Sequence, residues 1–180
     1  ALLNKLEQFQ SLLKEVDAVV FSDYGKGGLT HVTQMIAAAK AAGKFVLVDP
    51  KGDDYSKYQL ASMITPNRAE LRQVVGRWKD EADLTQKAQA LRETLKLDAL
   101  LLTRSEEGMS LFTAKGVEHV KAQAREVFDV SGAGDTVIAT MAVALAAGWA
   151  PGKAMTLANK AGGIVVGKLG TATVSLEELQ

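Results

Sequence analysis

Two spacings of apolar residues alternate along the chain and predict its helices and strands. Residues 2–16 carry apolar side chains at steps of three and four, with Lys5 and Glu7 on the opposite side, which is typical of an amphipathic helix. Short continuous apolar runs indicate strands that are buried on both faces, as in a parallel sheet. We expect such strands at residues 18–21, 44–48, 63–64 and 98–103.

Helices are expected between or after these strands, at residues 30–42, 84–95, 139–147 and 151–166. Thr30 is placed to cap the first of them. Residues 109–112 and 117–120 flank a short polar turn and predict a β-hairpin. The alternation of strands and helices predicts one α/β domain over residues 1–180, with three layers in which helices cover both faces of a mostly parallel sheet.

Polar residues follow the predicted parallel strands. Asp23 and Lys26 come after the first strand, and Lys51 comes after the second. Ligands of open α/β sheets bind at the carboxyl ends of the strands, so these side chains are expected near one edge. For Asp23 and Lys26, a solvated turn is as reasonable as a substrate contact, and a lone lysine such as Lys51 more often faces solvent than phosphate.

Residues 129–136, Asp-Val-Ser-Gly-Ala-Gly-Asp-Thr, carry the strongest chemical signal. A segment of high helix propensity follows, so Gly132, Ala133 and Gly134 are expected at a helix start. Glycine permits close approach of the backbone, and the free amides of a first helical turn attract anions. Asp135 beside such an anion site suggests a base that takes a proton from an attacking hydroxyl group during phosphoryl transfer.

A purely structural interpretation of this stretch stays open. Ser131 or Asp129 can cap the helix, and small residues allow two elements to pack closely. The stretch has neither the Gly-Lys-Ser/Thr of a P-loop nor the Gly-x-Gly-x-x-Gly of dinucleotide-binding proteins.

A second helix start is expected after the third predicted strand. Pro66 suits the first turn, and the free amides of residues 67–69 offer another anion site. Glu70 lies three residues after Asn67 and shares its helical face. From these residues alone, a capping box in which Glu70 reaches back to its own helix start is favoured over a ligand contact.

Composition excludes several classes of function. The 180 residues include 21 basic and 21 acidic side chains, which leaves no net field to attract nucleic acid or an anionic membrane. Cysteine is absent, so disulfides and thiolate metal sites are excluded. The sequence shows no secretory signal and no long apolar run, which favours the cytoplasm. The start at Ala1, without an initiator methionine, suggests a fragment or a processed product.

The 129–136 stretch and the Asn67-x-x-Glu70 spacing resemble signatures of the ribokinase family of carbohydrate kinases, and the resemblance extends over nearly the whole chain. It implies a ribokinase-like fold, with Asp135 as the catalytic base. The amides that would stabilise the transferred phosphoryl group are those of Gly132, Ala133 and Gly134.

The same resemblance implies ATP and Mg²⁺ as cofactors. The nucleotide phosphates would lie near Asn67, Arg68, Ala69 and Glu70, and Asn67 and Glu70 would hold the metal through water. His31 and His119 have no ligand spacing and are assigned no role.

The resemblance places Thr103, Arg104, Ser105 and Gly108 beside the nucleotide. The family usually has glycine where this chain has Ser105, so Arg104 is a candidate to replace part of the ribose contact.

Further along the chain, Asn159 corresponds to a polar position near the adenine base. For the adjacent Gly162-Gly163 pair, helix packing is an equal alternative. Asp129 and Ser131, together with residues 167–172, are the candidate site for a monovalent cation such as K⁺.

Within the family, the chain resembles kinases that act in bacterial lipopolysaccharide synthesis. This implies ATP-dependent phosphorylation of the anomeric hydroxyl of D-glycero-β-D-manno-heptose 7-phosphate, by a homo-oligomer in the complete protein. Family members carry an amino-terminal part that supplies a lid and much of the acceptor site and is absent here. We therefore expect residues 1–180 to be the ATP-binding, carboxyl-terminal part of a kinase and to be inactive alone.

Two alternatives remain, a kinase for another sugar or a nucleoside and a non-catalytic nucleotide-binding module. Asp135 argues against the second, because a protein that only binds nucleotide gains nothing from a carboxylate beside phosphate.

Overall fold

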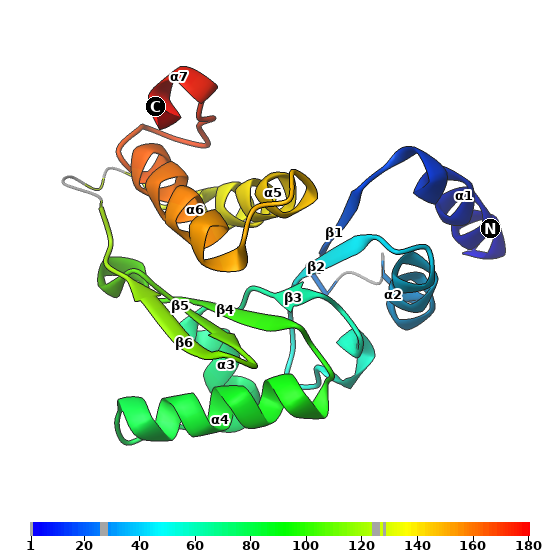
Figure 1. Ribbon diagram of the computed structural model, residues 1–180, viewed down its shortest axis with the longest axis horizontal. Coiled ribbons are helices and arrows are strands. Elements are labelled where there is room, and N and C mark those ends of the chain that lie inside the picture. The colour runs from blue at the N-terminus through cyan, green and yellow to red at the C-terminus, as the bar shows by residue number, and fades with distance from the viewer. Residues whose placement is uncertain (1, 26–28, 124–126, 128) are drawn as a thin grey trace.

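The computed structural model describes residues 2–25, 29–123, 127 and 129–180 (Figure 1). The described residues form a six-stranded sheet with the strand order β1-β2-β3-β4-β5-β6. The strands are β1 (Ala18–Ser22), β2 (Phe45–Asp49), β3 (Met63–Ile64), β4 (Ala99–Thr103), β5 (Met109–Thr113) and β6 (Gly116–Val120). Strands β1 to β4 run parallel, and the β5–β6 hairpin extends the sheet in antiparallel fashion. The predicted mostly parallel sheet and its hairpin are confirmed.

Helices cover both faces of this sheet. They are α1 (Leu2–Leu12), α2 (Val32–Ala41), α3 (Arg68–Val75), α4 (Glu81–Thr94), α5 (Ala133–Ala146), α6 (Pro151–Val166) and α7 (Leu176–Leu179). Short 3₁₀ turns are η1 (Leu13–Glu15), η2 (Ser56–Tyr58) and η3 (Ser105–Glu107). Figure 1 shows α5 and α6 on one face, with α3 and α4 against the other. This is the predicted three-layer arrangement.

Alternation of side chains along the central strands creates a separate hydrophobic core on each face. Leu100 and Leu102 of β4 join the core that contains residues of α2, α3 and α4, whereas Leu101 joins the core formed with α5 and α6. None of the three side chains is exposed to solvent. Because residues 99–102 of β4 are covered on both faces, they are all apolar, and only Thr103, the partly exposed last residue of the strand, is polar.

Two helix starts differ from expectation. Asn67 is the N-cap of α3, so Pro66 precedes this helix instead of occupying its first turn. Helix α2 begins at Val32, whose N–H donates to the Leu29 carbonyl in a preceding turn, so Thr30 is not its N-cap.

Near the carboxyl end of the chain, α5 begins at Ala133 with Gly132 as its N-cap, so the predicted helix start at Gly132, Ala133 and Gly134 is confirmed. The short helix α7 was not predicted. Its Ser175 and Glu178 form a capping box, and the Ser-x-x-Glu spacing is the local signal that was overlooked.

The loops that follow the parallel strands are tied together at one edge of the sheet. The N–H of Asp23, after β1, donates to the Asp49 carbonyl at 3.1 Å, and the N–H of Thr103 donates to the Pro66 carbonyl at 3.0 Å. Lys26, a candidate from the first of these loops, lies outside the described residues. No helix in the described part of the chain is long and apolar enough to cross a membrane.

Candidate active site

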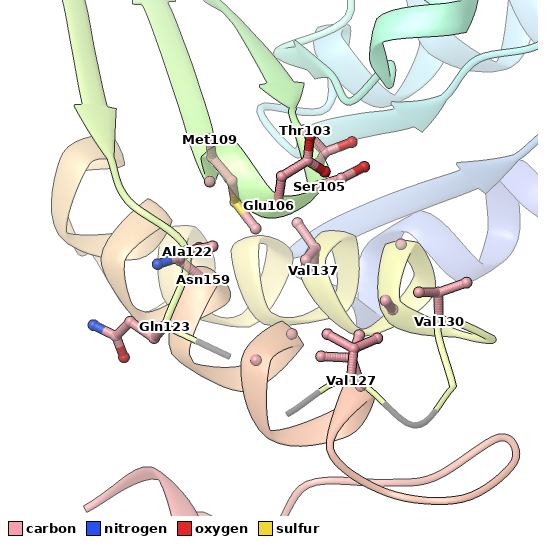
Figure 2. A pocket seen from close by; sticks show the side chains of 16 residues that line it. Thr103, Ser105, Glu106, Met109, Ala122, Gln123, Val127, Val130, Val137 and Asn159 are labelled. Atoms are coloured by element: carbon pink, nitrogen blue, oxygen red, sulfur yellow. The ribbon is translucent and has the colours of Figure 1, made fainter. Parts of the chain in front are cut away.

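A cavity of about 420 Å³ lies between the β4–β5 loop and the helices α5 and α6. Six of the residues predicted from the sequence line it, namely Thr103, Ser105, Gly108, Ala133, Gly134 and Asn159. Figure 2 shows Met109 and Ser105 on one side of this cavity and Val127 and Val130 on the other, with Val137 of α5 between them. Segments far apart in the sequence therefore meet around one space.

The apolar lining of this cavity was not anticipated. Met109 and Val137 are buried, whereas Val127 and Val130 keep 62% and 70% of their surface exposed. An apolar residue in a strand or helix is read as core, so sequence reasoning does not separate lining from packing. The available signal was the position of these two valines beside the glycine-rich stretch, since binding residues are concentrated on loops.

One wall of the cavity is formed by tight backbone packing. Gly108 has a φ of +91°, and a Cβ atom there would lie 1.9 Å from the Val120 carbonyl oxygen, so this position requires glycine. The buried Asn159 donates from Nδ2 to the Lys121 carbonyl at 2.8 Å. Asn159 thus lines the cavity and also holds the chain segment that follows β6.

A smaller cavity of about 130 Å³ adjoins the first. Both are lined by Thr103, Gly134 and Val137, and the smaller one adds polar side chains at the strand ends. These are Asp49, Lys51, Thr65, Asn67 and Glu70. A mostly apolar cavity therefore lies next to a more polar one at the start of α5.

The start of α5 keeps free hydrogen-bond donors. Gly132, its N-cap, has a φ of +75° and carries no side chain that could cap the helix. The Ala133 N–H donates to the Val130 carbonyl at 3.2 Å. The next two amides, of Gly134 and Asp135, have no acceptor within the helix, and none is found for them among the described residues. The Asp135 side chain, in the first turn of α5, is exposed and lines neither cavity, and its role as a base stays a prediction.

Glu70 takes part in two interactions. It forms a capping box with Asn67, in which the Glu70 N–H donates to Asn67 Oδ1 and the Asn67 N–H donates to Glu70 Oε2, both at 2.9 Å. Its other oxygen, Oε1, accepts a hydrogen bond from Lys51 Nζ. That hydrogen bond raises the pKa of Lys51. Lys51 is thus paired inside the site instead of facing solvent freely.

Asp49 carries the most perturbed carboxyl group in this site. Burial raises its pKa to about 6; Lys51 opposes the shift, while the carboxylates of Glu70, Asp135 and Asp23 add to it. The charge of Asp135, at the exposed start of α5, therefore adds to the rise in the pKa of Asp49 at the end of β2.

Asp23 is buried, so it is neither a solvated turn residue nor a free ligand. Its Oδ2 accepts hydrogen bonds from the Tyr58 hydroxyl at 2.6 Å and from Lys57 Nζ at 3.1 Å, and its Oδ1 accepts from the Gly25 N–H at 2.8 Å. Burial alone would raise the pKa of Asp23, but these hydrogen bonds together hold it below the usual value. Sequence reasoning missed Tyr58 and Lys57, which lie more than thirty residues away.

Arg104 does not line either cavity. All five N–H donors of its guanidinium group are used by Glu81, Glu107 and Ser110. The geometry leaves no donor for a ribose contact, so the expectation that Arg104 itself touches the nucleotide is not supported. Arg68 is likewise engaged, with Glu106 and Glu107.

The candidate cation site is partly assembled. Asp129 Oδ1 accepts the Ser131 N–H at 2.8 Å, and hydrogen bonds from Ser131 and from the Gly170 backbone hold the pKa of Asp129 below its usual value. The monovalent cation site at Asp129, Ser131 and residues 167–172 stays a prediction. Among the residues that the structure describes, no three His, Asp or Glu side chains are grouped to hold a metal. A metal here would consequently depend on backbone oxygens or water.

Comparison with known proteins identifies the family to which this geometry belongs. Residues 1–179 match the model of the pfkB family carbohydrate kinases. The chain belongs to this family.

Curated relatives agree with this membership. The chain is 59% identical over 167 residues to the D-beta-D-heptose 7-phosphate kinase of Bordetella bronchiseptica, covering 93% of this chain and 53% of that protein. It is 54% identical over 175 residues to the bifunctional protein HldE of Shewanella baltica, covering 97% of this chain and 37% of that protein. The chain thus spans about half, or less, of the length of these relatives.

Solved structures share the fold. Phosphofructokinase-2 from Escherichia coli, in complex with potassium, matches with a TM-score of 0.82 at 20% identity, over 98% of this chain and 60% of that one. Ribokinase from Arabidopsis thaliana, with ribose and ATP, matches with a TM-score of 0.79 at 23% identity, over 90% and 53%. The predicted ribokinase-like fold and carbohydrate kinase class are confirmed.

The raised pKa of Asp49 predicts how pH affects the stability of this pfkB-family chain. A carboxyl group with a pKa of about 6 in the folded state and 3.8 ordinarily favours folding when protonated. This contribution is complete below about pH 4 and is lost as pH rises through about 6. The Asp49→Asn variant should therefore gain stability relative to wild type over that interval, as measured by urea unfolding at a series of pH values.

Asp23→Asn is the matched control for this experiment. The lowered pKa of Asp23 gives the opposite sign, since its contribution is present above about pH 4 and is lost on further acidification. A stability difference between wild type and Asp49→Asn that does not change between pH 4 and 7 would contradict the prediction.

Proposed function

We propose that the protein containing this chain transfers the γ-phosphoryl group of ATP to the anomeric hydroxyl of D-glycero-β-D-manno-heptose 7-phosphate, forming the 1,7-bisphosphate for lipopolysaccharide synthesis. The observation that carries the proposal is the junction of the two cavities at the start of α5, where free amides adjoin Asp135. The names and identities of the Bordetella and Shewanella relatives support the choice of sugar.

The larger cavity suits the nucleoside of ATP. Its volume of about 420 Å³ falls within the range of small-molecule sites, and its lining combines apolar side chains with a few polar groups. Asn159 and the Gly162–Gly163 backbone supply the wall for the base, and Thr103, Ser105 and Gly108 border the ribose. The triphosphate then extends into the smaller cavity.

The smaller cavity supplies the electrostatics of transfer. The amides of Gly134 and Asp135 face developing negative charge at the start of α5, as does Lys51 from the loop after β2. Asp135 accepts the proton of the anomeric hydroxyl, the hydroxyl oxygen forms a bond to the γ-phosphorus, and the bond from that phosphorus to the β,γ-bridging oxygen breaks. ADP leaves with the electron pair of the broken bond.

Mg²⁺ fits the residues of the smaller cavity only through water. Both Glu70 oxygens already accept hydrogen bonds, from Asn67 and Lys51, so water between the carboxylate and the ion matches the donor set better than direct ligation. When bound, Mg²⁺ would neutralise phosphate charge. Asp129, Ser131 and the adjoining loop would hold K⁺ in a similar supporting role.

A kinase for another acceptor is the main alternative. The same fold occurs in phosphofructokinase-2, ribokinase and the adenosine kinase of Sinorhizobium meliloti, so the fold does not choose the alcohol. ADP release measured with heptose 7-phosphate, fructose 6-phosphate, ribose and adenosine distinguishes these acceptors.

We further propose that the complete protein is a cytoplasmic homo-oligomer with no nucleic acid or membrane partner.

The role of Asp135 as general base predicts a selective loss of turnover. Asp135→Asn keeps the size of the side chain but removes its basicity, so kcat should fall about 10²-fold or more while nucleotide affinity changes little. Steady-state kinetics of the full-length protein test this. Asp98→Asn, at the opposite edge of the sheet, is the control, and near-normal turnover by Asp135→Asn would exclude the assignment.

The water-mediated role of Glu70 predicts a change in metal dependence. Glu70→Gln keeps an oxygen that can cap α3 but loses the charge, so the Mg²⁺ concentration for half-maximal rate should rise more than the KM for the sugar. Glu70→Ala also removes the hydrogen bond that Glu70 Oε2 accepts from the Asn67 N–H and should cost about 0.5–1.5 kcal/mol of stability. An unchanged Mg²⁺ titration in Glu70→Gln would leave only the capping role.

We also propose that residues 1–180 alone bind ATP weakly and do not transfer phosphate. The loops proposed to bind the nucleotide are present in this chain. Correct positioning of the acceptor can lower the activation barrier by about 7–11 kcal/mol, and it depends on the remaining part of the protein. Calorimetric titration with ATP and an ADP-release assay with heptose 7-phosphate check both statements. Turnover close to that of the full-length protein would show that the acceptor site lies within this chain.

A further inference from the structure

The β4–β5 loop has two sides. Residues 103, 105, 106 and 108 line the main cavity, whereas Arg104 and Glu107 do not. The side chains that anchor the loop are thus distinct from those that it presents to the cavity.

Arg104 anchors the loop to α4. Its Nε and Nη2 donate to Glu107 Oε2 at 3.1 and 2.7 Å, and its Nη1 donates to Glu81 Oε2 at 3.0 Å and to Ser110 Oγ at 3.2 Å. Nη2 also donates to Glu81 Oε1. The arginine is only 8% exposed, and Glu81 is the first residue of α4. A buried, fully satisfied guanidinium therefore joins the loop to a long helix.

A second arginine extends the anchor to α3. Arg68 donates from Nη1 to Glu107 Oε1 at 3.0 Å and from Nη2 to Glu106 Oε1 at 3.2 Å. Glu107 is shared between the two arginines. Because Arg68 is the first residue of α3, the loop is also held next to the capping box of Asn67 and Glu70.

The turn that these contacts hold is unfavourable for its sequence. Ser105 has a φ of +53°, in the left-handed region that residues with a Cβ atom avoid. The turn is closed by the Arg104 N–H, which donates to the Gly108 carbonyl at 2.8 Å, and by the Glu107 N–H, which donates to the Arg104 carbonyl at 3.0 Å. Glycine would adopt this conformation readily, whereas serine needs support from its surroundings.

We propose that Arg104 is a positioning residue for nucleotide binding, which holds the Ser105 turn against α4 in the conformation that forms the cavity wall. The inference rests on the proposed function, since it takes the main cavity as the ATP site. Lysine cannot replace Arg104, because an ammonium group lacks the planar fork that bonds two carboxylates at once.

The test compares two buried arginines in the full-length protein. Arg104→Lys should raise the KM for ATP about tenfold or more and change kcat and the KM for the sugar by less than about threefold. Arg92→Lys is the matched control. Arg92 is 9% exposed and bonds Gln89 and the Leu97 carbonyl at the other end of α4, away from the cavity. An Arg104→Lys protein with the same KM for ATP as Arg92→Lys would overturn the proposal.

Rescue separates positioning from general loss of stability. Adding Ser105→Gly to Arg104→Lys should recover most of the lost affinity for ATP, since glycine takes the left-handed conformation without the anchor. Failure of the double variant to recover would overturn the proposal. If Arg104→Lys does not fold, Glu81→Gln removes one charge of the anchor and should show a smaller rise in KM with the same rescue.

Hydrogen exchange tests the anchor without relying on catalysis. The Glu107 and Gly108 amides should exchange about tenfold faster in Arg104→Lys than in wild type or Arg92→Lys. If exchange is faster in Arg104→Lys but the wild-type protein does not use ATP, the proposed function is rejected, whereas the role of Arg104 in anchoring the loop is retained. Unchanged exchange would reject the anchor whatever the kinetics.

Discussion

Parallel pairing of β1 to β4 is the constraint on which the rest of the structure depends. It brings the carboxyl ends of these strands to one edge, with Ser22 directly opposite Asp49 in the ladder. Parallel strands also need crossovers, which cover both faces of the sheet and create its two hydrophobic cores. The start of α5 reaches the same edge, so Gly134 lines both cavities.

Several carboxyl groups lie at this edge, and their surroundings shift their pKa values in different directions. Asp23 is held ionised by hydrogen bonds from Tyr58 and Lys57, whereas Asp49 is left with a raised pKa of about 6. Lys51 pairs with Glu70 and also opposes the rise in the pKa of Asp49. The Lys51–Glu70 pair thus links the loop after β2 to the first turn of α3.

The wall of the larger cavity depends on a different kind of support. Gly108 packs directly on the backbone after β6, and Asn159 holds the neighbouring Lys121 carbonyl, so the wall is shaped by main-chain contacts. Side-chain ion pairs then fix the Ser105 turn to α3 and α4. The β4–β5 loop is thereby fixed to the helices behind it.

The sequence by itself determined most of the elements and placed the central loop at a helix start. The β4 run, the hairpin, the helix start at Gly132 and the Asn67–Glu70 capping box all follow from patterns within a few residues. Tertiary structure decided the partners. Lys51 meets Glu70 across 19 residues, Arg104 meets Glu81 across 23, and Tyr58 meets Asp23 across 35. Periodicity specifies which face of an element is buried, but only packing of whole elements specifies which distant side chains meet there.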